Sequence, residues 1–180
     1  MNGGYRHRVL NSGWLKQWLR AAQLHAERIT QVRDTPGDAQ VDGWLFAAAI
    51  ANVERAAIAI VGKSHPAVLA YQAAVPDAKD VRDMVTHFDH YIRGKGWLQR
   101  LDAARPVQGF NVFVQYDGDS LTLHVGDRSV RVAEAYRAAA ELVDAVFEVL
   151  DAEAAEARAE LPDDFADDEV SRWYQSDQNV

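Results

Sequence analysis

The spacing of the apolar residues changes twice along this chain, and this change limits its possible folds more than any other feature. Apolar side chains recur every three or four residues up to residue 93 and again over 133–159, a period that indicates amphipathic helices. Between residues 110 and 132 they alternate with polar ones, which indicates short strands. The pattern predicts a mainly α protein, an antiparallel helical bundle with a small antiparallel β-meander before the last long helix.

Turn and capping residues set the expected boundaries of these elements. Ser12 is a candidate N-cap for the first helix, behind a flexible lead-in over residues 1–11, and Pro36-Gly37 lies beyond the end of this helix. Asp117-Gly118 and Gly126-Asp127 suit the two turns of the meander. Further helices are expected at 38–62, 67–75, 77–93 and 133–159, strands at 110–116, 120–125 and 129–132, and the tryptophans Trp14, Trp18, Trp44 and Trp97 mostly in the core.

The net charge of −8 is concentrated near the C-terminus. Residues 151–180 hold ten acidic residues and two arginines, whereas residues 1–150 hold 17 residues of each sign. We therefore expect a globular domain over 1–160 and an acidic tail over 161–180. Because the body is balanced, the acidic total does not argue against binding of nucleic acid.

Composition excludes several classes of site. The chain has no cysteine, so it has no disulfide, thiolate nucleophile or cysteine-based zinc site. The apolar run from Trp44 to Val61 contains Asn52, Glu54 and Arg55, which favours a buried helix over a membrane span. No signal peptide, phosphate loop or dinucleotide fingerprint is visible. A cytoplasmic protein without a membrane partner is expected.

The stretch from Val81 to Gly96 combines titratable side chains with an apolar stripe. Val81, Met84, Val85, Phe88 and Ile92 recur at the spacing of one core-facing side of a helix. The other faces of the same helix carry the charged and titratable groups, which are Arg82, Asp83, His87, Asp89, His90 and Arg93.

Residues 82–87, RDMVTH, resemble the Arg-X4-His signature of HEPN (higher eukaryotes and prokaryotes nucleotide-binding) domains. In that family the position after the arginine is typically Asn, Asp or His, and here it is Asp83. The resemblance implies a helical bundle that acts as a metal-independent endoribonuclease of toxin or anti-phage defence type, without a cofactor. Other members are inactive and bind RNA, nucleotides or partners. A second match, Arg20 to His25, has alanine at the polar position and lies along an apolar helix, so we do not assign it.

The residue types suit cleavage of RNA by attack of its own 2′-hydroxyl. A histidine titrates near neutral pH, so His87 is expected to act as the acid or base. Arg82 is expected to stabilise the charge that grows on the phosphate. Asp83 lies four residues before His87 on the same helical face and is expected to orient it.

Helical geometry separates the two main candidates. Arg82 and His87 are five residues apart, so they point about 140° away from each other on a straight helix. The resemblance implies that two copies of the motif meet in a homodimer. The nearby cations Arg93, Lys95, Arg100 and Arg105 are expected to hold flanking phosphates of the RNA. An antitoxin or a regulatory protein is a further candidate partner.

Three other interpretations use the same sequence. Asp83, His87 and His90 fall at i, i+4 and i+7, so they are candidate ligands of a metal-dependent hydrolase. The chain is alternatively a non-catalytic binding module, whose acidic tail docks on a partner or folds back over the basic connector. The charged residues are otherwise only the solvated face of a helix, with His25 and His124 in packing or surface roles.

Overall fold

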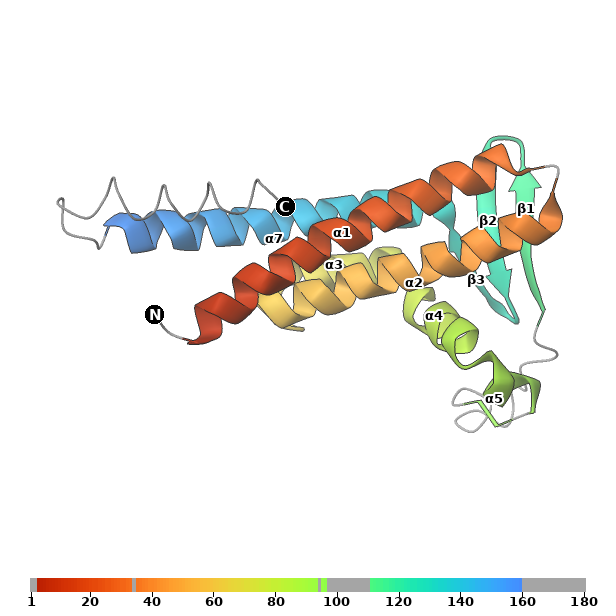
Figure 1. The fold of residues 1–180 in the computed structure, drawn as a ribbon, viewed down its shortest axis with the longest axis horizontal. Coiled ribbons are helices and arrows are strands. Elements are labelled where there is room, and N and C mark those ends of the chain that lie inside the picture. Colours follow the sequence, from red (N-terminus) through yellow and green to blue (C-terminus); the bar gives the residue numbers. More distant parts are fainter. Residues whose placement is uncertain (1–2, 34, 94, 97–110, 160–180) are drawn as a thin grey trace. The chain divides into compact units, whose positions relative to one another are not determined.

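The computed structural model describes residues 3–33, 35–93, 95–96 and 111–159. The chain divides into two compact units, 1–146 and 147–180. The described part is mainly helical and has a three-stranded antiparallel sheet before its last long helix, as the apolar pattern predicts (Figure 1). The elements are α1 (Gly3–Gln31), α2 (Pro36–Val61), α3 (Pro66–Ala74), α4 (Ala78–Thr86), α5 (Phe88–Ile92), β1 (Val112–Asp117), β2 (Ser120–Val125), β3 (Arg128–Arg131) and α7 (Val132–Ala159).

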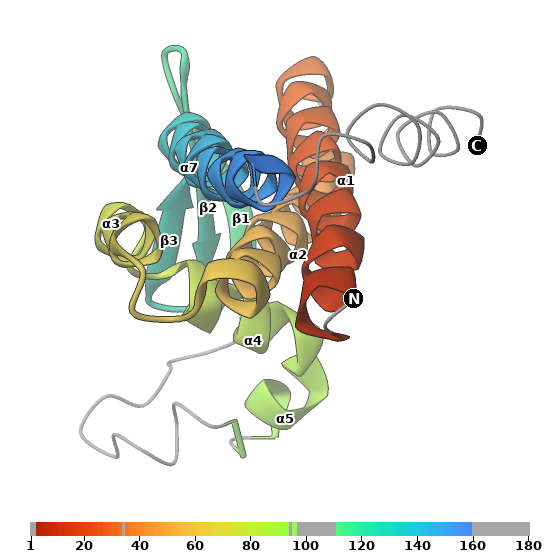
Figure 2. The same cartoon turned by 90° about the vertical axis from the view of Figure 1, so that its left-hand side faces the viewer.

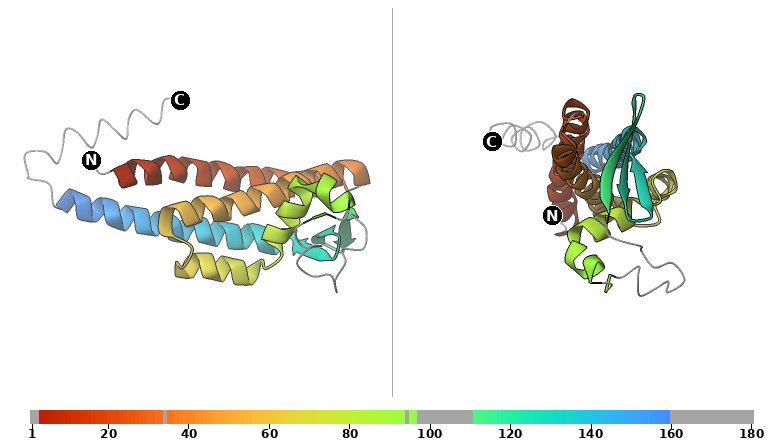
Figure 3. Two further views of the ribbon diagram at one scale, coloured as in Figure 1. Left: turned by 90° about the horizontal axis from the view of Figure 1, so that it is seen from below. Right: turned by 90° about the vertical axis from the view of Figure 1, so that its right-hand side faces the viewer.

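Helices α1 and α2 run side by side in opposite directions (Figures 1 and 3). Leu15, Ala22 and Ile29 are fully buried along α1, one every two turns. Small side chains let other elements approach α2 closely, and the buried ones include Ala47, Ala49, Ala51 and Ala57.

Two predictions about α1 are wrong. The helix begins at Gly3 and not after Ser12, because residues 3–12 contain no proline and a helix tolerates an interior glycine at a cost of about 1 kcal/mol. Trp14 is 56% exposed and lies outside the core. Trp18 and Trp44 are half-buried, and Trp97 lies outside the described residues.

Helix α2 is the most apolar long element of the described part. Residues Gly37–Val61 are long and apolar enough to cross a membrane, with a mean hydropathy of 1.6 over the most apolar window. That window is 56% buried inside the protein, and the core helix of a soluble protein passes the same test. The observation is therefore weak support for a membrane span.

The sheet has the order β1-β2-β3 and is joined by two-residue turns. Gly118 and Gly126 open these turns with φ of 58° and 60°, a conformation that glycine adopts without steric cost. The inward face of the sheet lies against α2, where the Gln40 side chain donates a hydrogen bond of 2.7 Å to the Val112 carbonyl. The buried side chains of this face include Val112, Leu123, Val125 and Val130.

Helix α7 crosses the boundary between the two units. Its part in the first unit buries Ala139, Val143 and Val146, which recur at helical spacing along one side. There α7 lies alongside α3 (Figure 2). The residues that line a pocket between these two helices include Ala70, Ala74, Ala138 and Leu142. Residues 147–159 continue the helix in the second unit. The predicted tail, 161–180, lies outside the described residues, and its boundary stays a prediction.

Candidate functional site

The segment that carries the RDMVTH motif is two helices and not the single predicted helix over 77–93. Helix α4 ends at Thr86, and its C-cap is His87, whose φ of −117° and ψ of 36° leave the helical region. The His87 N–H donates the last hydrogen bond of α4, to the Asp83 carbonyl at 3.0 Å, and the His87 carbonyl accepts from His90 N at 2.9 Å in α5. The motif histidine is therefore the C-cap of α4 and the N-cap of α5. Figures 1 and 3 show the two separate helices.

The break also splits the predicted apolar stripe. Val81 and Met84 are fully buried, but Phe88 is 50% and Ile92 64% exposed. Tyr91 takes the inward position of α5 instead, and its ring packs so closely on Gly96 that a Cβ there would collide with it. The prediction that Phe88 and Ile92 face the core is wrong, because the break changes the rotational phase of the second helix.

Arg82 and Asp83 bind each other. The Arg82 Nη2 atom lies 2.7 Å from Asp83 Oδ1, and both side chains are partly buried. Asp83 therefore does not adopt the predicted role of orienting the His87 side chain. Its hydrogen bond to His87 runs through the backbone, which fixes the position of residue 87 but not its imidazole.

His87 and His90 present two exposed imidazole rings side by side. Their centroids lie 5.9 Å apart and their planes differ by 20°. His90 Nε2 also lies 3.7 Å from Asp89 Oδ2, a weak exposed contact. Arg93 and Lys95 are exposed just beyond these rings, whereas Arg100 and Arg105 lie outside the described residues.

The alternative metal site is not assembled in this structure. The break at His87 removes the regular i, i+4, i+7 spacing of Asp83, His87 and His90. Throughout the described ranges, no group of three His, Asp or Glu side chains is placed to hold a metal ion.

Ion pairs attach the start of α4 to the sheet. Arg128 at the beginning of β3 lies 3.3 Å from Asp80 and 3.9 Å from Asp77, and the Ser129 N–H donates to Asp77 at 3.1 Å. Burial raises the pKa of Asp80 above its ordinary value, although Arg128 acts in the opposite direction. These contacts hold the first turn of α4 against β3, and they thereby orient the helix that leads to His87.

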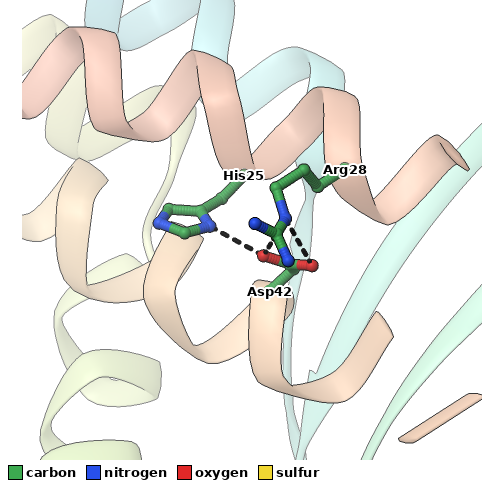
Figure 4. A network of polar contacts seen from close by, with 3 residues as sticks. All are labelled: His25, Arg28 and Asp42. Atoms are coloured by element: carbon green, nitrogen blue, oxygen red, sulfur yellow. Dashed lines mark hydrogen bonds and ion pairs between the residues drawn. The ribbon is translucent and has the colours of Figure 1, made fainter. Parts of the chain in front are cut away.

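A second polar cluster joins α1 to α2 (Figure 4). Asp42 is buried, and its carboxylate lies 2.8 Å from His25 Nδ1 and 3.1 Å from Arg28 Nε. A buried carboxylate needs such partners, because an unpaired one costs several kcal/mol. The sequence prediction gave His25 only a packing or surface role and missed Asp42. A signal was available for Arg28, which lies six residues before the turn at 34–37, whereas Asp42 lies five residues after it.

We compared the chain with protein-family models, with curated proteins and with solved structures, and none of the three comparisons finds a match. The resemblance of residues 82–87 to HEPN domains therefore stays a prediction from the motif.

Proposed function

We propose that this chain is a metal-independent, HEPN-type endoribonuclease that acts as a homodimer in a toxin or anti-phage setting. The observation that carries the proposal is the exposed pair of imidazoles, His87 and His90, at the break between α4 and α5. Exposed Arg93 and Lys95 follow them directly and suit the phosphates of an RNA strand.

The proposed reaction is transesterification within the RNA. A base removes the proton of a 2′-hydroxyl, the oxygen attacks the adjacent phosphorus, and a 2′,3′-cyclic phosphate forms. The bond from phosphorus to the 5′-oxygen breaks, and an acid protonates the leaving oxygen. His87 takes one of these two roles in the proposal, and His90 takes the other; the nearness of their rings, with centroids 5.9 Å apart, supports this assignment. Arg82 stabilises the phosphate charge once RNA competes with Asp83 for its guanidinium.

Apolar side chains beside the histidines support the homodimer. Ile92 is 64% exposed and Phe88 is half-exposed, so a second copy that covers them would bury a substantial apolar area. A dimer of this kind would also bring two copies of the motif helix, with Arg82 and His87, into one interface, which is the arrangement that the resemblance implies.

The test is cleavage of mixed RNA in the presence of EDTA. We expect His87→Ala to lower the rate by about 100-fold or more, because general acid–base catalysis contributes about that factor. Thr86→Ala, an exposed neighbour, is the control for His87, and Arg137→Ala, exposed on α7, is the control for Arg82→Ala. Cleavage by His87→Ala at the rate of Thr86→Ala, with equal melting temperatures, would rule out the proposed role of His87.

A second candidate is a non-catalytic module that binds RNA or a partner. The 2.7 Å pair of Arg82 with Asp83 favours it, because a carboxylate already occupies the arginine that would stabilise the transition state. Binding of RNA without cleavage, unchanged by His87→Ala, is the result expected for this candidate.

A further inference from the structure

The outward face of the β-sheet carries a stacked aromatic pair. Phe113 on β1 and His124 on β2 are cross-strand partners, with ring centroids 4.6 Å apart and planes only 11° apart. That distance matches the spacing of neighbouring strands, so the rings stack across the strands and not along them. Since β1 is an outer strand of the described sheet, the second face of the Phe113 ring is directed away from β2, and Phe113 is 40% exposed.

Hydrogen-bonding side chains surround this pair. The register places Ser129 beside His124, and it places Gln115, Thr122 and Arg131 in the adjacent cross-strand row. Strand alternation puts all of them on the same face as Phe113. Among the described residues of this face, Arg131 supplies the positive charge, and it lies 2.9 Å from Glu134. The face thus combines one open aromatic surface with polar groups and little net charge.

We propose that this face binds unpaired bases of single-stranded RNA, with one base stacked on Phe113. Every base has a flat π-face, so stacking on an exposed aromatic ring binds single strands with little dependence on sequence. A duplex keeps its bases inside and offers no such partner. A protein partner would favour a contiguous apolar patch, whereas Phe113 stands among polar side chains. The inference rests on the proposed function for its ligand class, but it concerns binding and not cleavage.

The test measures fluorescence anisotropy of a short labelled 2′-O-methyl RNA, which lacks the attacking hydroxyl and survives the proposed chemistry. We expect Phe113→Ala to weaken binding about ten-fold, which lies within the range for loss of one stacked base. Phe113→Trp is expected to retain the affinity of the wild type, because it keeps a ring. Trp14→Ala removes an aromatic of comparable exposure from α1 and is expected to leave binding unchanged.

The dependence on salt provides a second measurement. Phe113→Ala leaves Arg131 in place, so a phosphate contact of Arg131 is common to both proteins. The ratio of wild-type to Phe113→Ala affinity is therefore expected to fall with salt concentration less steeply than the logarithmic slope of about −0.7 that one phosphate contact gives. A ratio that falls several times more steeply would mean that phosphate contacts dominate, and it would overturn the stacking proposal.

The outcomes separate this inference from the proposed function. If the wild type binds RNA without cleaving it, and Phe113→Ala binds more weakly, the result supports RNA binding by the sheet face and contradicts the nuclease. Cleavage with equal affinities for Phe113→Ala and Trp14→Ala contradicts the sheet face alone. If Phe113→Ala keeps its RNA affinity but changes the oligomeric mass, the face binds a protein partner and the inference is overturned. The inference is also overturned if the wild type does not bind the RNA. Thermal melting identifies a variant that fails to fold, and Phe113→Trp then carries the comparison.

Discussion

Gly43 on α2 lies against Leu123 on β2 so closely that a Cβ at residue 43 would stand 2.8 Å from Leu123 Cδ1. Leu123 is fully buried at the centre of the inward face of the sheet. Because Gly43 has no side chain, the sheet can approach α2 closely. The ion pairs of Arg128 with Asp77 and Asp80 attach α4 to β3, so this approach also positions α4.

Gly43→Ala is expected to destabilise the protein although alanine is the better helix former. The added methyl displaces Leu123, and overpacking of this kind costs about 1–3 kcal/mol, which offsets the gain in helix propensity of about 1 kcal/mol. Gly37→Ala is the matched control, because nothing lies within 4 Å of a Cβ there. Urea unfolding should show a lower free energy for Gly43→Ala than for Gly37→Ala, and the reverse order would contradict the close approach.

Asp42→Ala is expected to lower the free energy of unfolding by about 1–3 kcal/mol. The substitution removes the acceptor of His25 and Arg28 and leaves the partly buried imidazole without its 2.8 Å partner. Asp144→Ala, an exposed aspartate on α7, is the control. Chemical denaturation provides the measurement, and equal stabilities of the two variants would show that the cluster contributes nothing net.

The stability difference between the wild type and Asp80→Asn is expected to depend on pH. Burial raises the pKa of Asp80 above its ordinary 3.8, so the folded protein binds this proton more tightly than the unfolded chain does. The wild type should therefore gain stability relative to Asp80→Asn as the pH falls from neutral towards about 4, and lose it as the pH rises through the folded pKa. Asp144→Asn should show no such trend in thermal melts at each pH.

Asp83→Asn separates the two candidate functions of the motif. Removing the carboxylate releases the guanidinium of Arg82 from its 2.7 Å contact, so RNA affinity at low salt should rise by a few-fold. If Asp83 assists the reaction, the cleavage rate with bound RNA falls at the same time. Anisotropy and single-turnover cleavage measure the two effects, and a fall in affinity would contradict the view that Asp83 neutralises Arg82.

The elements that the sequence predicted correctly depend on local chemistry. Glycines at 118 and 126 determine the turns, and the alternation between them determines the strands. The break at His87 was not predictable in this way, because residues 85–90 contain neither proline nor glycine. It follows from tertiary packing, since Tyr91 and not Phe88 turns inward after the break.

The candidate site was predicted in part. Its exposed histidines lie on the predicted segment, but the pairing of Asp83 with Arg82 depends on side-chain positions that periodicity does not specify. The cluster at Asp42 likewise depends on how α1 and α2 meet. Counting residues outward from the turn at 34–37 pairs Asp42 with Arg28 but not with His25, which lies about one helical turn further away.

Because of the break at His87, the local stability of α5 can differ from that of α4. Helix α5 has five residues, too few for a stable isolated helix in water, and it rests chiefly on the packing of Tyr91. Helix α4, by contrast, is held to β3 by Asp77 and Asp80. We therefore expect partial unfolding to detach α5 before α4, so that amide hydrogen exchange is faster after His87 than before it. In the proposed function, the imidazoles would then stand on the part of this segment that adjusts most readily to the shape of an RNA strand.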